Sequence, residues 1–418
     1  MSEKTPIRVG IIGLGGYANT HHEAVLRLEA VNEARLICTC DPSLSPFSED
    51  KLSLDFSRRG VKFFDNYQAM LKACADQLDL VVIPTPLALH AEMHKACVDA
   101  GIACYLEKPP TLDESELERM IQVDQRAHRK TLVGFNYIIE PARLAIKQRL
   151  LSGEFGPVKQ ASFLGFWSRP RSYFKRNHWS GRLLIEDQLV LDSCLGNALS
   201  HFVQNLLFWV GNKSLISLGE TSEVRARLYR AHAIEGADTF FVEAVVNGVL
   251  LRLVISHACK EKEVNTEIVA CERATIRYIA GSASEIVWQD GRSESIGVTP
   301  FDTPYMNHLD HYRYLRGETD RPAITLEECR SFVHLNDLSY ISSETIENIA
   351  PEHIVIEEED ERTHIPTIIN LSDYSQRFLD EGIWPNLGSR KFPNGPGTAK
   401  ISDLPRLRNV LLVMASSS

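Results

Sequence analysis

Short apolar runs alternate with helical patterns along the first third of the chain. Between the runs, segments such as 19–28 and 90–100 space their apolar residues as amphipathic helices do. Strands separated by helices favour a parallel, doubly wound sheet. The apolar runs that predict its strands are 8–12, 35–40, 78–83, 102–106 and 131–134.

The pattern changes after an expected helix at 141–151 and a turn cluster at 153–157. Longer alternating runs follow, and the Asn247-Gly248 and Asp290-Gly291 pairs mark hairpin turns. These features predict an α+β domain with an open, mainly antiparallel sheet. We therefore expect a Rossmann domain at 1–135, a substrate and oligomerisation domain at 136–365 and a C-terminal extension at 366–418. The runs that predict the second sheet are 158–167, 218–229, 239–257, 275–279 and 286–288.

A glycine-rich turn follows the first expected strand. Gly13 permits a tight turn, Gly15 has no Cβ to block a ligand, and Ala18 stands where a third glycine is common. The N–H groups of such a turn and the positive end of the helix dipole hold a diphosphate. Asp41, at the end of the second strand, is suited to the ribose hydroxyls of NAD and would repel the 2′-phosphate of NADP. The alternative is that Asp41 only starts the turn at 41–43.

Bulk composition removes several classes of function. The net charge of −10 argues against a nucleic-acid binder, and no apolar stretch approaches the ~20 residues of a membrane helix. The polar N-terminus leads straight into the first strand without a signal peptide, which predicts a cytoplasmic protein. The nine cysteines are scattered and odd in number, which favours buried free thiols. A metal pair at Cys38 and Cys40 is the alternative, and we expect no metal.

Lys108 is the first candidate for chemistry. Glu107, Lys108 and Pro109 directly follow a parallel strand, and ligands of open α/β sheets sit at the carboxyl ends of such strands. An ammonium group there stabilises a developing alkoxide. A cis bond before Pro109 is conceivable. The alternative is a surface lysine in a proline turn, paired with Glu107.

His201 is the second candidate. It lies in a predicted helix that runs from Gly196 and ends at Gly211, and Asn197, four residues earlier, should share its face. A lone histidine on such a helix is more often structural. The long segment before it carries Trp179, which can stack on a sugar or on a cofactor, and Arg182, which can bind hydroxyls or phosphate. The alternative there is a packed Trp with a solvated Arg. Weaker candidates, for which an aromatic helix face is the simpler reading, are Tyr305 and His311.

Over residues 6–345 the chain resembles the Gfo/Idh/MocA oxidoreductase family. Four features carry the resemblance in order, and Glu107-Lys108-Pro109 is the most specific of them. The other three are Gly13-Leu14-Gly15-Gly16-Tyr17-Ala18 with His21, Thr85-Pro86 with His90, and Gly134-Phe135-Asn136-Tyr137. The cofactor contacts that we expect are Gly13, Gly15, Gly16, Tyr17, Ala18, Asp41, Thr85, Pro86, His90, Glu107, Lys108 and Asn136.

The resemblance implies that Lys108 contacts substrate near the nicotinamide. The family usually carries Asp-x-x-x-His in its second domain, and the matching positions here are Asn197 and His201. Asn carries no charge and would not raise the pKa of His201 as a carboxylate would. Asp192, close by in sequence, can compensate. The expected catalytic residues are Lys108, His201 and Asn197, and Trp179 and Arg182 join these three in the expected substrate site.

The resemblance also implies an NAD(P)-dependent dehydrogenase of a sugar, cyclitol or related polyol, working as a homo-oligomer (a dimer or tetramer) with no nucleic-acid or membrane partner. Two alternatives remain open. One is an enzyme that retains NAD and cleaves glycosides through transient oxidation. The other is a non-catalytic NAD- or sugar-binding regulatory protein. Catalysis requires that Lys108 and His201 come together at the coenzyme's reactive carbon.

Overall fold

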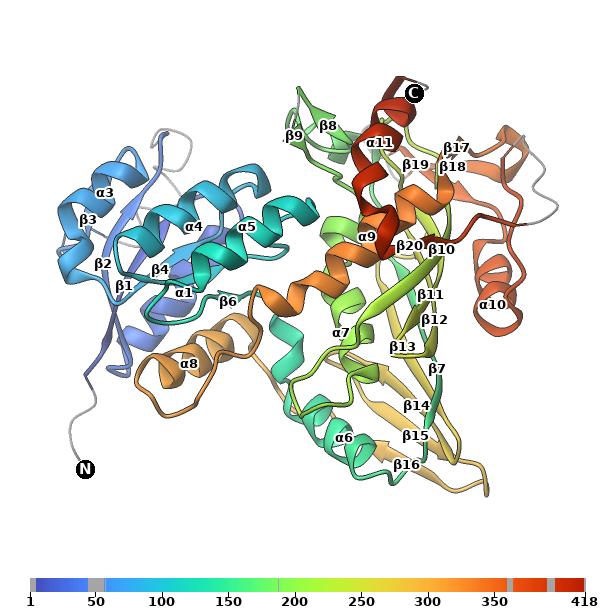
Figure 1. The fold of residues 1–418 in the computed structure, drawn as a ribbon, viewed down its shortest axis with the longest axis horizontal. Helices are drawn as coiled ribbons and strands as arrows, with labels where there is room; N and C mark the ends of the chain where they lie inside the picture. Colours follow the sequence, from blue (N-terminus) through green and yellow to red (C-terminus); the bar gives the residue numbers. More distant parts are fainter. Residues whose placement is uncertain are drawn as a thin grey trace. The chain divides into compact units, whose positions relative to one another are not determined.

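The computed structural model describes residues 5–43, 56, 58–186, 188–358, 364–388 and 395–416, and the chain divides into two compact units (Figure 1). Unit 1 comprises Met1–Thr111, Ser115–Glu140 and Phe301–Cys329, and unit 2 comprises Leu112–Glu114, Pro141–Pro300 and Arg330–Ser418. The stretch 301–329 thus groups with the first unit, although we expected it in the second domain. The expected extension at 366–418 groups with unit 2.

Unit 1 contains a six-stranded parallel sheet in the order β3-β2-β1-β4-β5-β6. This confirms the doubly wound sheet predicted from the apolar runs, and the short strand β3 lies outside the runs given above. The strands are β1 (Ile7–Ile12), β2 (Ala34–Cys40), β3 (Lys62–Phe64), β4 (Leu80–Ile83), β5 (Ala103–Leu106) and β6 (Leu132–Val133).

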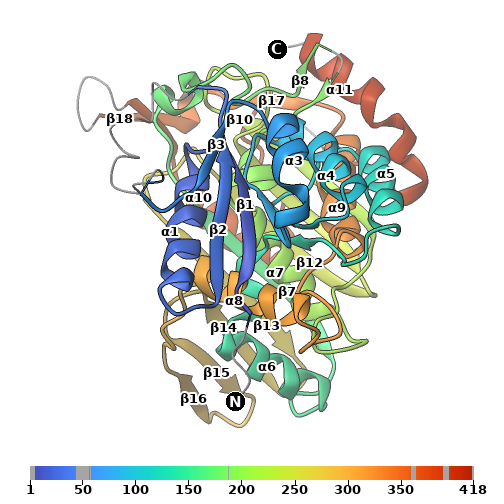
Figure 2. The ribbon, with the colours of Figure 1, turned by 90° about the vertical axis from the view of Figure 1, so that its left-hand side faces the viewer.

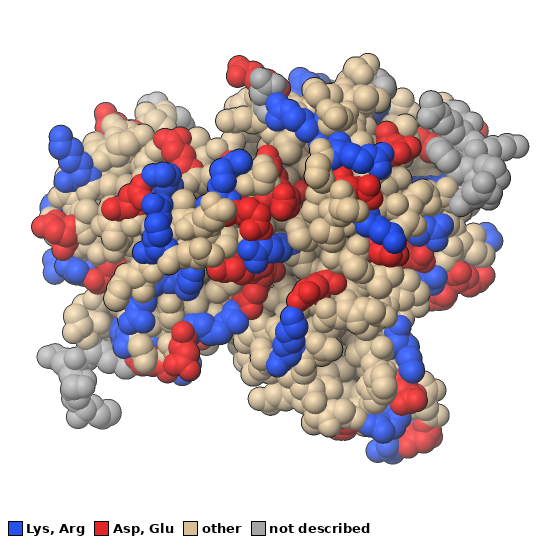
Figure 3. Space-filling model, viewed as in Figure 1, with Lys and Arg blue, Asp and Glu red and all other residues tan. Residues whose placement is uncertain are grey.

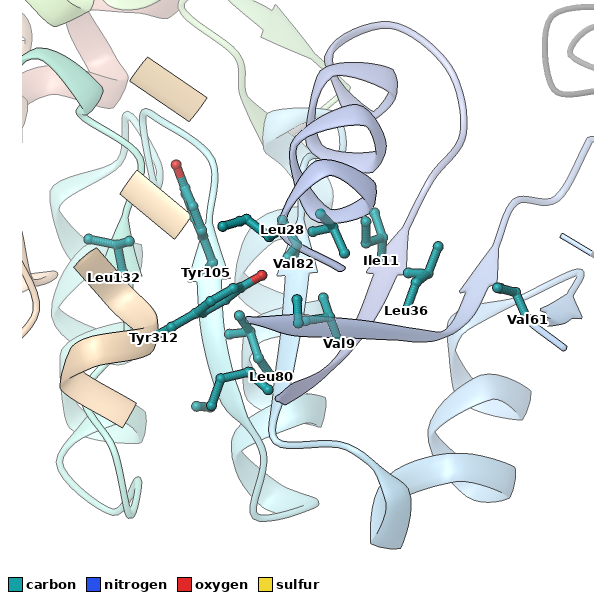
Figure 4. Close-up of a cluster of buried hydrophobic side chains, with 14 of the residues drawn as sticks. Val9, Ile11, Leu28, Leu36, Val61, Leu80, Val82, Tyr105, Leu132 and Tyr312 are labelled. Carbon is teal, nitrogen blue, oxygen red and sulfur yellow. The ribbon is translucent and has the colours of Figure 1, made fainter. Parts of the chain in front are cut away.

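Helices cover both faces of this sheet, and Figure 2 shows α1 on one side with α3 and α4 on the other. The apolar side chains of β1 and β4 meet Leu28 of α1 and Tyr312 of α8 in one core (Figure 4). Tyr312 is fully buried there, which explains why the segment 301–329 belongs to unit 1. The helices are α1 (Tyr17–Glu29), α3 (Tyr67–Cys74), α4 (His90–Asp99), α5 (Glu114–Asp124) and α8 (Thr303–Leu315), with 3₁₀ turns at Ala75–Gln77, Leu87–Leu89, Asn136–Ile139 and Glu327–Cys329.

Unit 2 is built on a large mixed sheet in the order β16-β15-β14-β13-β7-β12-β11-β10-β17, with β20 beside β10. Among the described strands of this sheet, the β7–β12 and β10–β17 pairs are parallel and the other pairs are antiparallel, which confirms the mainly antiparallel sheet. Asn247 and Gly248 both have positive φ at the predicted hairpin. The strands are β7 (Val158–Phe166), β10 (Thr221–Arg230), β11 (Thr239–Val246), β12 (Val249–Ser256), β13 (Val264–Cys271), β14 (Ala274–Ile279), β15 (Ser284–Trp288), β16 (Ser293–Ile296), β17 (Ile346–Asn348) and β20 (Ala399–Lys400).

The two faces of this sheet carry different helices. Helices α7 and α9 pack on one face and α10 lies on the other (Figure 1). Phe378 of α10 contacts Phe241 of β11 in a second core. The helices of unit 2 are α6 (Pro141–Leu151), α7 (Ser200–Val210), α9 (Arg330–Ser343), α10 (Leu371–Glu381) and α11 (Leu407–Ser416). Short helical turns lie at Arg171–Lys175, Cys194–Ala198, Pro351–His353 and Ile401–Arg406. Two small two-stranded sheets pair β8 (Leu184–Ile185) with β9 (Gln188–Leu189) and β18 (Ile354–Glu358) with β19 (His364–Ile368).

Charged side chains of both signs are interspersed over the face of the molecule that Figure 3 shows. All nine cysteines are buried free thiols, as predicted, and burial raises the pKa of Cys40 to about 12. Across the described ranges, none of the helices combines the length and apolarity that crossing a bilayer requires.

Candidate active site

The turns that follow five parallel strands of unit 1 carry the predicted cofactor residues. Since the strands are parallel, their carboxyl ends meet at one edge of the sheet, where open α/β sheets bind ligands. The structure therefore brings this whole group to one edge. The residues are Gly13 to Ala18 after β1, Asp41 after β2, Thr85 and Pro86 after β4, Glu107 and Lys108 after β5, and Asn136 after β6.

The start of α1 has the features of an anion site. Gly13 has φ +110° and Gly16 has φ +54°, so both use backbone conformations that other residues rarely adopt. The α1 N-terminus has no side-chain cap and no acidic residue in its first turn. Among the described residues, the main-chain N–H groups of Gly15, Gly16 and Tyr17 donate to no protein group. These donors and the helix dipole fit a diphosphate.

Asp41 is held in place at the end of β2. One carboxylate oxygen accepts the Leu14 N–H at 2.9 Å and the other accepts the Ser43 N–H at 3.0 Å. The residue is buried, with 9% of its surface exposed. The Asp41 side chain is therefore fixed beside the glycine turn.

Main-chain groups around His90 shape the turn that carries Lys108. The Lys108–Pro109 peptide bond is cis, and the buried His90 ring lies 2.9 Å from the Thr85 carbonyl and 3.1 Å from the Pro109 carbonyl. Burial lowers the pKa of His90, against the opposing influence of these carbonyls. The turns after β4 and β5 are thus linked through one imidazole, with Lys108 half-buried between strand and proline.

A buried chain of hydrogen bonds leads away from Glu107. His21 Nε2 lies 3.1 Å from Glu107 Oε1, and His21 Nδ1 lies 2.9 Å from His308 Nε2. Tyr312 Oη lies 3.4 Å from His308 Nδ1. Because an ionised carboxylate only accepts, we assign the tautomers so that each group donates toward Glu107. Burial lowers the pKa of His308 well below its usual range, which keeps this imidazole neutral.

The sequence indicated His21 through its motif but gave no signal for His308. His308 lies almost 290 residues after His21, and only the grouping of α8 with unit 1 brings them together. His311 lies three residues after His308 on α8. Its ring stacks on Tyr314, and its two nitrogens are buried without a hydrogen-bond partner among the described residues. This packing supports the aromatic-face interpretation of His311.

Tyr17 and Asn136 meet at the same edge of the sheet. Asn136 Nδ2 donates to Tyr17 Oη at 3.3 Å, and Asn136 Oδ1 accepts from Tyr105 Oη at 3.0 Å. Burial and the nearby Glu107 raise the pKa of Tyr17, so its phenol stays protonated. The pair ties the start of α1 to the end of β6.

In unit 2, the expected continuous helix from Gly196 is wrong. A π-helical turn at Cys194–Ala198 ends at Leu199, where φ is −104° and ψ is 11°, and α7 then begins at Ser200. Ser193 Oγ accepts the Gly196 N–H at 2.9 Å, and this cap starts the separate turn. The regular four-residue spacing that predicted a shared face for Asn197 and His201 does not apply across this break.

Asp192 links the turn to the long segment before it. Asn197 Nδ2 donates to Asp192 Oδ1 at 2.9 Å, and the Gly181 N–H donates to Asp192 Oδ2 at 2.8 Å. The Asp192 N–H in turn donates to the Arg182 carbonyl at 3.0 Å. A buried carboxylate thus stands directly beside the Asn197 amide.

Trp179 and Arg182 lie on the stretch that Asp192 holds. Asn177 Oδ1 accepts the Trp179 N–H at 3.1 Å, which closes a tight turn. The half-buried Trp179 ring has the Arg176 guanidinium 5.1 Å from its centre. Arg182 is well exposed and pairs with Glu235 at 3.2 Å.

His201 is the second residue of α7 and is half-buried. Lys108 belongs to unit 1 and His201 to unit 2, so their approach around a substrate stays a prediction. In the parts of the chain that the structure describes, no cluster of three or more His, Cys, Asp or Glu side chains has a metal-binding arrangement. A shallow hollow of about 260 Å³ on β14–β16 includes none of the candidate residues.

Residues 7–135 match the model of the GFO_IDH_MocA family, described as "Oxidoreductase family, NAD-binding Rossmann fold". Among curated proteins, an inositol 2-dehydrogenase of Rhizobium meliloti is 28% identical over 41% of this chain and 49% of its own length. A glycosyl hydrolase family 109 protein of Shewanella amazonensis is 29% identical over 36% of this chain and 33% of its own length. The chain thus spans half or less of the length of these relatives.

Solved structures extend the likeness to most of the fold. The WlbA dehydrogenase of Bordetella pertussis, solved with NADH and UDP-GlcNAcA, superposes with a TM-score of 0.65 at 20% identity. The superposition covers 81% of this chain and 96% of that one. At this identity the likeness shows the arrangement of both sheets and nothing about the ligands of this chain.

Proposed function

On the premise that the chain belongs to the Gfo/Idh/MocA oxidoreductase family through residues 7–135, we propose that it is an NAD(P)-dependent dehydrogenase. Its substrate carries a ring hydroxyl of a sugar, cyclitol or related polyol. The observation that carries this proposal is the convergence of the uncapped α1 N-terminus, Asp41 and Lys108 at the carboxyl edge of one parallel sheet. Inositol and nucleotide-sugar dehydrogenases among the similar proteins support the substrate class.

The residues of unit 1 fit a bound dinucleotide. The N–H groups of Gly15 and Gly16 would hold its diphosphate, and Asp41 would bind the adenosine ribose. Asp41 carries a negative charge where NADP has its 2′-phosphate, so we propose NAD as the preferred cofactor. When bound, the nicotinamide supplies the hydride acceptor for oxidation of an alcohol.

The proposed chemistry assigns one role to each candidate. Lys108 stabilises the oxygen of the substrate as it loses its proton, and the contacts of His90 with the Thr85 and Pro109 carbonyls fix the turn that carries this lysine. His201 takes that proton as general base. Asn197 positions the substrate hydroxyls, and the buried carboxylate of Asp192 orients Asn197. Trp179 and Arg182 complete the proposed substrate site.

A screen of sugars and polyols for NAD⁺ reduction, followed by NADH absorbance, tests the function. The expected result is NADH formation with at least one substrate and a slower or absent reaction with NADP⁺. A protein that gains thermal stability from sugars but forms no NADH with any of them would instead be a non-catalytic binding protein.

A second candidate function is glycoside cleavage with retained NAD. The similarity to a glycosyl hydrolase family 109 protein favours it. Product analysis separates the two functions, because cleavage of a glycoside without net NADH excludes the simple dehydrogenase. A nucleotide that copurifies with the protein and resists dialysis would also favour glycoside cleavage with retained NAD.

We also propose that the protein is a cytoplasmic homo-oligomer, with contacts made through the open sheet of unit 2. The basis is the resemblance to the family. Light scattering on the purified chain measures its mass in solution. A mass of 47.1 kDa would identify a monomer and contradict this part of the proposal.

A further inference from the structure

Arg169 lies just after β7, clamped between two aromatic rings. Its guanidinium carbon is 4.1 Å from the centre of the Trp167 ring and 4.5 Å from the centre of the Tyr173 ring. The Arg169 N–H donates to the His257 carbonyl at 3.1 Å, so the main chain is fixed as well. The guanidinium is thus positioned by packing on both sides.

The Arg169 guanidinium has no acceptor within the part of the chain that the structure describes. Among the described residues it forms no hydrogen bond and no ion pair, and its Nε atom is buried without a partner. Other arginines of unit 2 are paired, such as Arg143 with Glu267 and Arg182 with Glu235. A buried donor left unpaired destabilises a protein, which makes this arrangement unusual unless an external acceptor completes it.

The ionisable side chains His257, His232 and Asp238 lie near Arg169 and engage other groups. His257 Nδ1 donates to the Trp167 carbonyl at 2.7 Å, and burial lowers the pKa of His257 to about 3, so its ring is neutral. His232 lies 2.9 Å from the Arg169 carbonyl through Nε2 and 2.7 Å from Asp238 through Nδ1. The carboxylate of Asp238 is therefore engaged by His232, and it also accepts the Ala231 N–H.

Arg169 and the two rings that flank it, Trp167 and Tyr173, form a group that we call the clamp. The clamp lies at the same end of the unit 2 sheet as the candidate substrate residues. Cys194 Sγ, two residues from Asp192, donates to the Asp238 carbonyl at 3.2 Å. Gly181, which donates to Asp192, lies so close to Phe174 that an added Cβ would be 3.3 Å from its ring. Phe174 in turn contacts the His232 ring. Contacts within unit 2 thus connect Arg169 with Asp192 through a few side chains.

The segment that carries the clamp is cationic in an acidic protein. Residues 167–182 contain five Lys and Arg residues and no Asp or Glu, whereas the whole chain has a net charge of −10. Such a local excess of positive charge attracts anions.

We propose that Arg169 binds an oxyanion on the substrate, a carboxylate or a phosphoryl group, so that the enzyme acts on acidic sugars or polyols. This inference rests on the proposed function and specifies its substrate class. The planar fork of a guanidinium matches both kinds of oxyanion through paired hydrogen bonds. Stacking between Trp167 and Tyr173 orients that fork before the ligand arrives.

Calorimetry of the full chain with glucuronate, glucose 6-phosphate and glucose tests the inference. The variants are Arg169→Met, which keeps an apolar stem between the rings, and Arg171→Met, which removes an exposed cation two residues away as a matched control. We expect one acidic probe to bind about 10- to 100-fold more tightly than glucose, and Arg169→Met to abolish that preference. Arg171→Met should keep it. The tighter of the two acidic probes identifies the kind of oxyanion.

Equal binding of glucose and both acidic probes to the wild type, or an acid preference that survives in Arg169→Met, overturns the inference. If Arg169→Met does not fold, Arg169→Lys replaces it, and a folded Lys variant with full acid affinity also counts against a guanidinium site.

Turnover distinguishes the failure of the oxyanion site from the failure of the proposed dehydrogenase function. Arg169-dependent binding without NADH formation would refute the dehydrogenase alone, and turnover of neutral sugars only would refute the oxyanion site alone.

Discussion

The two groups of candidate residues are held by different means. In unit 1, main-chain turns at the ends of parallel strands position Gly13, Asp41 and Lys108. In unit 2, side-chain hydrogen bonds to Asp192 and Asn177 hold the stretch that carries Trp179. The first arrangement follows from the sheet itself, whereas the second depends on a few polar residues far apart in sequence. We therefore expect a substitution at a candidate residue of unit 1 to alter the chemistry. A substitution at one of the polar residues of unit 2 should instead alter the local structure.

The largest expected effect is that of Lys108→Ala. We expect turnover of an identified substrate to fall about 100- to 10,000-fold while NAD binding is unchanged, because the ammonium acts on the substrate oxygen. Steady-state kinetics and NADH fluorescence titration measure the two quantities. Lys95→Ala on α4 is a matched control, since Lys95 is an exposed lysine of the same unit that pairs with Asp99. Turnover like that of the wild type in Lys108→Ala would contradict the proposed role.

Asp192→Ala tests the unit 2 side of the comparison. It removes acceptors for the Gly181 N–H and the Asn197 amide, and hydrogen bonds to a charged group are worth about 1.5–3 kcal/mol each. We expect a loss of about 2–4 kcal/mol in urea unfolding together with lower turnover. Glu235→Gln, which removes the partner of the exposed Arg182, should cost less than about 1 kcal/mol. A similar loss in both variants would refute a special role for Asp192.

His311→Phe should stabilise unit 1 by about 1–2 kcal/mol, because it replaces a buried ring whose nitrogens lack partners. The pKa of His311 is about 3 in the folded state and about 6.5 when unfolded. The unfolded state therefore binds more protons below pH 6.5, and stability falls as the pH drops from 6.5 toward 3. His311→Phe should weaken this acid sensitivity, which thermal unfolding across that range measures. His308→Phe on the same helix should instead destabilise, since it breaks the chain to Glu107.

The smallest effect is expected from Asn197→Asp, which restores the usual family residue. It places a second carboxylate within hydrogen-bond distance of Asp192. Repulsion raises the pKa of one of the two in the folded state, so the stability of the variant relative to wild type should fall as the pH rises from about 4 to 7. A stability difference that does not change with pH would show that the two side chains separate.

Local sequence patterns predicted unit 1 well because each strand, turn and helix there is specified by neighbouring residues. The glycine turn, Asp41 and Lys108 all follow apolar runs, and strand polarity alone gathers them. The same reasoning failed at Gly196, where the Ser193 cap and the close approach of the Leu191 carbonyl interrupt an apparently continuous helix. Composition does not encode such contacts.

Contacts between residues far apart in the sequence could not be predicted for the same reason. The contact of His21 with His308 depends on α8 packing in the core of unit 1, and the clamp on Arg169 depends on how the segment after β7 turns back. No periodicity in the chain indicates either one. The position of Lys108 at the end of β5 was therefore predictable, but the contacts of His308 and of Arg169 were not.

The membership of α8 in unit 1 has a consequence for how the chain is made. During synthesis, the ribosome releases the six strands of the N-terminal sheet long before it reaches Tyr312, and most of the second sheet emerges in between. The core of unit 1 can therefore be completed only after α8 has been synthesised. Until then, the apolar surface that α8 covers in the folded chain stays exposed. A truncated protein that ends at residue 140 would keep every glycine of the nucleotide turn yet expose the surface that Tyr312 covers.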